Sequence, residues 1–371
     1  MILLTIVIFV IILGLLVFVH ELGHFIMARR AGMAVEEFGF GFPPRIFGIK
    51  RGETTYSINW IPLGGFVKIL GENGESQDPK AFGSKGFWPR FSVLVAGVLM
   101  NAIFAWALIA IAMTSGLPTI IGQGDTLPSY AHAQAAQVSV VEVEDGTPAA
   151  NAGIKVGDSI YKINGQQITS IDQVQALTSQ SAGESTEFEL KRGNSDFTKT
   201  ITPRVNPPEG EGPLGIALSS VAKVSYPWYR SLWLSVMTTA GLIWATLSAF
   251  GQLIVQAVHH QPVSQALSGP VGIAVLTHDV AQLGLIYLIQ FTAVLSINLA
   301  IINIVPFPAL DGGRVLFLII EKIRRRKLNP NAESYANAIG FMLLILLMVF
   351  VTIKDINHYS DSFKHLFSNL F

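Results

Sequence analysis

The chain begins with a long apolar stretch. From Ile2 to Val19 every residue except Thr5 is apolar or glycine, and the next cluster of charge is the pair Arg29–Arg30. About 20 consecutive apolar residues cross the hydrocarbon core of a bilayer as a helix. The pattern therefore predicts a membrane-spanning helix over residues 2–28, with the two arginines at one membrane surface.

Three later apolar stretches also have the length of a span, namely 91–115, 285–308 and 336–353. The loop between the first two spans is rich in Lys and Arg, so the positive-inside rule places it in the cytoplasm and the amino terminus outside. A further stretch, 232–258, is apolar but dotted with Ser, Thr and Gln. If it crossed, the basic cluster Arg324–Lys327 would lie outside, so we expect helical segments on the outer membrane surface instead.

Composition agrees with a membrane protein. Half of the 371 residues are hydrophobic and only 13% are charged, with no net charge, whereas an average chain has about 25% charged residues. The lipid bilayer is therefore an expected partner, and nucleic acid is not. Because the chain has no cysteine, disulfides, thiolate zinc sites and cysteine nucleophiles are excluded. The predicted fold class is a polytopic α-helical membrane protein with about four transmembrane helices.

The loop between the first two spans has β character. Residues 54–70 alternate apolar and polar side chains around the pair Gly64–Gly65, and they follow a stretch F-G-F-G that ends in Gly39-Phe40-Gly41. This pattern predicts a membrane-associated β-hairpin or small sheet. Two readings stay open. The hairpin is either an ordinary cytoplasmic one, or one that dips into the membrane with an edge strand free to pair with an extended peptide.

The first span carries ionisable side chains. His20 and His24 are four residues apart, with Glu21 next to the first of them. Residues i and i+4 share a helix face, so both imidazoles can bind one zinc ion, and Glu21 can take a proton from a water molecule there. An H-E-x-x-H match can arise by chance, but ionisable groups inside a membrane are costly and indicate a functional site. The sequence predicts one Zn²⁺ per chain, near the cytoplasmic side of the membrane.

A catalytic zinc site usually has three protein ligands, so two histidines leave one ligand to find. Asp311 follows two prolines near the cytoplasmic end of the third span, at the depth that the topology gives to the histidines. On its own, Asp311-Gly312 is typical of a turn. The two prolines unwind the helix locally, which a membrane tolerates where the unwound segment lines a cavity. Asp311 also lies at the same depth as the two histidines, and both points favour it as the third ligand. Asn303 is either a contact for a substrate backbone or a helix–helix contact.

Residues 123–220 are more polar than the rest of the chain. The segment from Gly146 to Ile160, followed by Ile163-Asn164-Gly165, resembles a PDZ domain, with a short helix from Pro148, a strand over 159–163 and a tight turn at Asn164-Gly165. An unrelated extramembrane β domain is the alternative. Parity of the spans places this domain outside the cytoplasm, and the resemblance implies that it binds a peptide ligand by strand addition.

The motifs taken in order resemble a known family. H-E-L-G-H in the first span, the PDZ-like segment, S-G-P-V-G-I-A from Ser268, and N-x-x-P-x-P-x-L-D-G-G from Asn303 together are similar to the bacterial site-2 proteases of peptidase family M50. The regulator-of-sigma-E branch is the most similar, although many of its members have two tandem PDZ domains and this chain has room for one. The resemblance implies that His20, His24 and Asp311 bind zinc and that Glu21 is the general base.

The same resemblance implies a function. The chain is expected to be a zinc metalloendopeptidase of the bacterial cytoplasmic (inner) membrane that cuts single-pass membrane proteins, such as anti-sigma factors or signal-peptide remnants, in regulated intramembrane proteolysis. The expected substrate contacts come from the β-hairpin, the preceding glycine-rich stretch and the third span: Gly64, Gly65, Phe66, Gly39, Phe40, Gly41 and Asn303.

The expected organisation has four parts. A first catalytic half (1–118) contains the spans 2–28 and 91–115 and the hairpin; a PDZ domain (123–220), surface helices (228–283) and a second catalytic half (284–371) follow. Two rival interpretations stay open: a membrane zinc protease whose third ligand is Glu321 or Glu333, and a catalytically idle PDZ-bearing membrane adaptor. A transporter is a weaker rival, because the sequence shows no paired half-repeats.

Overall fold

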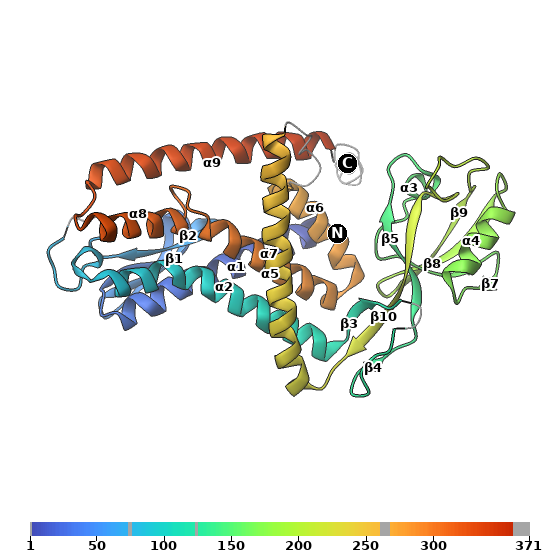
Figure 1. The fold of residues 1–371 in the computed structure, drawn as a ribbon, viewed down its shortest axis with the longest axis horizontal. Coiled ribbons are helices and arrows are strands. Elements are labelled where there is room, and N and C mark those ends of the chain that lie inside the picture. The colour runs from blue at the N-terminus through green and yellow to red at the C-terminus, as the bar shows by residue number, and fades with distance from the viewer. Residues whose placement is uncertain (1, 73–75, 123–124, 260–267, 359–371) are drawn as a thin grey trace. The chain divides into compact units, whose positions relative to one another are not determined.

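The computed structural model describes residues 2–72, 76–122, 125–259 and 268–358 (Figure 1). The chain folds as two units, one made of residues 1–109, 236–278 and 291–371 and the other of residues 110–235 and 279–290. The long helices are α1 (Ile2–Arg30), α2 (Phe87–Ser115), α5 (Trp228–Val258), α7 (Leu285–Ile304) and α9 (Pro330–His358). Shorter helices are α3 (Pro148–Asn151), α4 (Ile171–Gln180), α6 (Pro270–Leu283) and α8 (Asp311–Arg324).

Five helices in the described part of the chain are long and apolar enough to cross a membrane, and they belong to α1, α2, α5, α7 and α9. Three of them, α1, α2 and α9, contain the expected spans 2–28, 91–115 and 336–353, whereas α7 ends at Ile304, four residues before the end of the expected span 285–308. The fifth, α5, covers the stretch 232–258, where several surface segments were expected and the structure has one uninterrupted helix of 31 residues. Length and composition admit α5 as a fifth span, so the count of four and the sides of the membrane stay predictions.

The expected hairpin is larger than the sequence suggested. Strand β1 (Val35–Arg51) pairs antiparallel with β2 (Thr54–Ile69). The turn lies at Gly52, whose φ of 64° suits glycine, and not at Gly64-Gly65, which is part of β2. Glycine is needed at position 64 for another reason, because a Cβ there would overlap the Phe42 ring.

Both strands bend, and the bend creates a sheet of four segments. The first part of β1 (35–42) pairs on one side with 55–61 and on the other with 65–69, while the second part of β1 (45–51) pairs with 54–59. The segment 65–69 is therefore an edge of this sheet. This edge matters for the site described below, because it runs beside α1.

The polar middle of the chain forms an antiparallel sheet in the second unit. The strand order is β3-β10-β5-β6-β8-β9, with β4 paired to β10 and β7 to β6. The strand bounds are Leu117–Ile120 for β3, His132–Ala133 for β4, Gln137–Val143 for β5, Ser159–Ile163 for β6, Gln166–Gln167 for β7, Thr186–Arg192 for β8, Ser195–Ile201 for β9 and Ile216–Ser225 for β10. Strand β6 has the expected bounds, and the expected tight turn follows at Asn164 and Gly165, which both have positive φ.

A compact apolar core in the first unit holds the elements that carry the site. It joins α1, the hairpin, α2 and α8 through buried residues that include Ala28, Val35, Val93 and Leu318. Helices α1 and α2 approach closely, since a Cβ at Gly23 would overlap the main-chain oxygen of Ala96. The same core therefore fixes the spacing between three helices and the sheet.

Candidate metal centre

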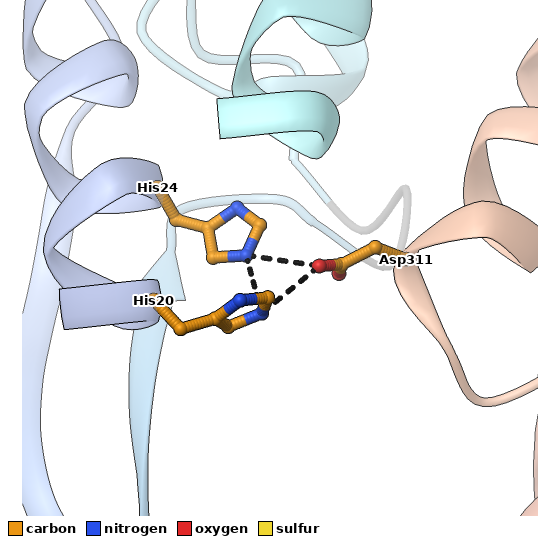
Figure 2. Close-up of side chains that lie close together, drawn as sticks. All are labelled: His20, His24 and Asp311. Atoms are coloured by element: carbon orange, nitrogen blue, oxygen red, sulfur yellow. Dashed lines mark hydrogen bonds and ion pairs between the residues drawn. The ribbon is translucent and has the colours of Figure 1, made fainter. Parts of the chain in front are cut away.

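Three side chains converge from two helices that are far apart in the sequence. Helix α1 presents His20 and His24 from consecutive turns, and α8 presents Asp311 from its first turn (Figure 2). The two Nε2 atoms lie 3.2 Å apart, and each lies 3.1 Å from Oδ2 of Asp311. The structure thus brings together the three residues that the sequence predicted as ligands of one ion.

The prolines and glycines of the motif around Asp311 explain its position. Helix α7 ends at Ile304, just before two prolines that cannot donate a main-chain hydrogen bond. Ala309 has a φ of 77°, and its N–H donates to Oδ1 of Asn337. A side chain on Gly312 would overlap main-chain oxygens at the end of α7. The D-G-G sequence therefore lets α8 start directly against the end of α7, where the helix amino terminus favours the Asp311 carboxylate.

Each histidine has a second partner that orients its ring. Nδ1 of His24 donates to the main-chain oxygen of Val93 at 2.8 Å, which leaves its Nε2 lone pair free for a ligand. Nδ1 of His20 lies 3.4 Å from the Asn101 amide, and Asn101 Oδ1 is buried with no hydrogen-bond partner in the described part of the chain. If the Asn101 amide is rotated by 180°, its Oδ1 accepts a hydrogen bond from Nδ1–H of His20. Both histidines then carry their proton on Nδ1 and leave Nε2 free for a metal.

Asn101 is a residue whose role in the site the sequence did not predict. It is fully buried in α2, and the Ser296 hydroxyl of α7 donates to its main-chain oxygen at 2.8 Å. The available signal was that Asn101 is the strongly polar residue inside an otherwise apolar span. The sequence does not show which face of α2 contacts α1, so it could not predict that Asn101 lies next to His20.

The site fits a zinc ion on three observations. Oδ2 of Asp311 is buried and has no hydrogen-bond partner among the described residues. Gly97 of α2 faces the two imidazoles, and a Cβ at this position would overlap both rings. Two imidazole nitrogens and one carboxylate oxygen form the kind of donor set that catalytic zinc uses with a fourth position left open. His20, His24 and Asp311 could therefore hold one zinc ion.

A cavity of about 380 Å³ opens beside these three residues. Glu21 lines it, and the hairpin edge contributes Phe66, Val67, Lys68 and Ile69. Of the other expected substrate contacts, Gly65 lies against Glu21, since a Cβ there would come within 3.2 Å of its side chain.

The remaining expected substrate contacts do not line this cavity. Gly39 and Phe40 pair with Phe66 and Gly65 on the neighbouring segment, which places them one strand further away, and Gly41 and Gly64 also belong to the sheet. Asn303 sits half-buried near the end of α7, and within the described residues its side chain makes no hydrogen bond.

An ion pair that the sequence did not predict borders the same cavity. Arg314, one turn after Asp311, binds the carboxylate of Glu72, which follows β2. Burial acts to lower the pKa of Arg314, but Glu72 outweighs it and the pKa lies above its ordinary value. Burial likewise acts to raise the pKa of Asp311, but the contacts with His20 and His24 hold it below its ordinary value. Asp311 is thus an anion at neutral pH, as a metal ligand must be.

Comparison with known proteins decides the family. The model of peptidase family M50 matches residues 8–347. The chain belongs to peptidase family M50. A Clostridium perfringens protein named as a candidate zinc metalloprotease is 36% identical, over 92% of this chain and 95% of its own length. The regulator of sigma-W protease RasP of Bacillus subtilis is 30% identical over 95% of this chain and 98% of its own, and the zinc metalloprotease RasP of Geobacillus kaustophilus is 30% identical over 96% and 98%.

The M50 membership and these relatives confirm the enzyme class and the cofactor expected from the sequence, a zinc metalloprotease. A solved structure, the PDZ domain of an SdrC-like protein from Listeria monocytogenes, is also similar. It is 22% identical, covers 25% of this chain and 93% of its own, and has a TM-score of 0.20.

Proposed function

We propose that this M50 protease hydrolyses peptide bonds within or next to the transmembrane segments of single-pass membrane proteins. His20, His24 and Asp311 are the zinc ligands, and Glu21 is the general base. The observation that carries the proposal is the meeting of three ligand atoms within 4.8 Å of one another, with both histidines in a helix long and apolar enough to span a membrane.

The residues around the cavity suit peptide hydrolysis. A bound zinc ion supplies Lewis acidity, which polarises a peptide carbonyl and makes a water molecule more acidic. Glu21 borders the cavity next to His20, where it takes the proton from the attacking water and then delivers it to the leaving amine. Asn101 and the main-chain oxygen of Val93 keep both imidazoles turned toward the ion.

The hairpin edge suits an extended substrate. A substrate helix must unwind before one of its carbonyls reaches the metal, and the main-chain groups so freed need partners in a membrane. The segment 65–69 pairs with β1 along one side only, and Phe66–Ile69 line the cavity. A substrate strand added to this edge would recover the lost hydrogen bonds.

The polarity of the hairpin supports a place inside the membrane. Ile58 and Trp60 are 53% and 67% exposed, whereas the polar side chains of Ser57 and Asn59 between them are buried. Asn59 donates to the main-chain oxygen of Gly41. A sheet facing water has the opposite arrangement, with apolar side chains inside. Lipid contact is the environment in which this exposed apolar face is stable, and it favours the reading in which the hairpin dips into the bilayer.

The substrate class follows from the relatives and from topology. The Bacillus subtilis relative is named as a regulator of sigma-W protease, which supports anti-sigma-type substrates and regulated intramembrane proteolysis. The basic loop between α1 and α2 supports a zinc site near the cytoplasmic side of the bacterial inner membrane. Because α2 crosses the membrane between that cytoplasmic loop and the β-rich unit, the β-rich unit lies outside the cytoplasm. There it serves as a PDZ domain that binds a peptide ligand.

The contacts of Glu321 weigh against it as the third ligand. Glu321 binds Arg90 at 2.8 Å and accepts a hydrogen bond from the main chain of Leu328 at 3.0 Å. Its carboxylate is therefore engaged in an ion pair of its own, and it does not line the cavity beside the histidines.

Substitution of Glu21 by Gln tests the function. In liposomes that also contain a single-pass substrate, the Glu21→Gln protein should retain one zinc ion per chain and lose cleavage, because the amide cannot accept the proton from water. The matched control is Glu53→Gln on the exposed hairpin turn, which should cleave normally. Cleavage by Glu21→Gln at the native rate would remove Glu21 from the role of general base, and an intact zinc content without cleavage by the native protein would favour the idle adaptor.

A further inference from the structure

A second hollow, of about 220 Å³, lies between the start of α2 and the end of α8. It shares no residue with the cavity beside the metal centre. Five of its eight lining residues are basic: Arg90, Lys322, Arg325, Arg326 and Lys327. One, Glu321, is acidic, so the hollow has a strong excess of positive charge.

Three of the five basic side chains have no carboxylate partner among the residues that the structure describes. Glu321 is already paired with Arg90, and Lys327 donates to the main-chain oxygen of Gly83 at 2.9 Å. Among the described residues, no carboxylate lies within ion-pair distance of Lys322, Arg325 or Arg326. Nε of Arg90 is buried and has no hydrogen-bond partner among the residues that the structure describes. The carboxyl end of α8 offsets only about half a unit charge.

The backbone holds the basic side chains together. Arg325, the first residue after α8, has the left-handed conformation with a φ of 53°, at a position where glycine is the usual residue. Lys322 is held against two aromatic rings, with Nζ 3.9 Å from the centre of the Phe87 ring and 4.9 Å from that of Trp88. These contacts keep the positive groups at the rim of one hollow.

The hollow lies at the depth of a membrane surface. Phe87, which lines the hollow, begins the candidate span Phe87–Ser115, and Lys327, which also lines it, precedes the candidate span Asn331–Asn357 by four residues. The hollow therefore lies where helices leave the apolar core. Trp88 is 68% exposed at this level, and exposed tryptophans are typical of the membrane–water interface.

We propose that this hollow binds the phosphate of an anionic phospholipid headgroup. Arginine and lysine are the usual partners of phosphate, and basic pockets at helix ends bind acidic lipid headgroups. A lipid already resident in the bilayer reaches the hollow at the correct depth, whereas a soluble phosphate compound would share the charge but not the acyl chains beside Trp88.

The test measures lipid binding to the full-length protein in phosphatidylcholine nanodiscs. Phosphatidylglycerol with brominated acyl chains is added in steps, and quenching of Trp88 is obtained by subtracting the signal of a Trp88→Phe protein. The double variant Lys322→Gln/Arg326→Gln removes two unpaired charges and leaves the Arg325 backbone unchanged. The matched control is Arg30→Gln/Arg51→Gln, which removes two exposed charges elsewhere in the same unit.

Each Lys or Arg near a lipid surface contributes about a fivefold gain in binding, so the hollow variant should bind phosphatidylglycerol about 25-fold more weakly than the native protein. The control should bind it with native affinity, and brominated phosphatidylcholine should quench both proteins equally. Equal binding by the hollow variant and the native protein would overturn the proposal, as would an equal loss in the control. Displacement of the lipid by millimolar glycerol phosphate would assign the hollow to a soluble phosphate instead.

Discussion

Replacement of Asn101 by Leu tests whether α2 orients the proposed zinc ligand His20. Leu has the same branched side-chain shape as Asn, with methyl groups in place of the amide oxygen and nitrogen, and the hydrogen bond from Ser296 goes to the main-chain oxygen of residue 101, so the contact between α2 and α7 should survive. The change removes the side-chain amide that lies 3.4 Å from Nδ1 of His20. Loss of such a partner typically weakens metal binding by about 10- to 100-fold, which corresponds to about 1.4–2.7 kcal/mol.

The assay is a competition between the detergent-solubilised protein and a chromophoric zinc chelator, which yields the zinc Kd. Asn101→Asp distinguishes the direction of the hydrogen bond, because a carboxylate can accept from Nδ1–H but cannot donate. This variant should bind zinc at least as tightly as the native protein. Thr114→Val is the matched control, since the Thr114 hydroxyl donates to a main-chain oxygen within α2 itself. An unchanged Kd for Asn101→Leu, or an equal weakening by Asp and by Leu, would refute the role of Asn101.

Three further predictions concern the same unit. Gly97→Ala should weaken zinc binding by about 5- to 150-fold, because overpacking costs about 1–3 kcal/mol. The control Gly86→Ala lies in open space and should leave the zinc Kd unchanged. Asp311→Ala should abolish stoichiometric zinc in metal analysis of the purified protein, and Glu321→Ala should retain it; the reverse result would revive Glu321 as the ligand. Asp355→Asn should lower the unfolding temperature in a thermal-shift assay, because its buried carboxylate accepts the N–H of the third residue of α6 at 2.8 Å and a charged hydrogen bond contributes about 1.5–3 kcal/mol.

Much of the candidate site could be predicted from the sequence, because its parts have local signals. The four-residue spacing of His20 and His24 fixes a shared helix face. The prolines before Asp311 mark where α7 must end, and the positive-inside rule gives that end the same depth as the histidines. Depth is shared by many residues, however, so the sequence alone could not show that Asp311 points at the imidazoles.

Other features depend on contacts that no local pattern records. The ion pair between Arg314 and Glu72 joins α8 to the end of the hairpin, and each residue alone is typical of a solvated charge. Strand β1 was missed because its glycines and the pair Pro43-Pro44 interrupt any period-two pattern. The glycine pair of β2 interrupts the alternating pattern in the same way, and the structure shows that Gly64 makes room for the Phe42 ring and Gly65 for Glu21.

The most direct test of the central claim is anomalous X-ray scattering at the zinc edge from crystals of the full-length protein. The account predicts a single anomalous peak per chain, with about 2.0–2.1 Å to Nε2 of His20 and of His24 and about 2.0–2.2 Å to the Asp311 carboxylate. A peak bound to the histidines but remote from Asp311, or a stoichiometric peak at any other residues, would contradict it.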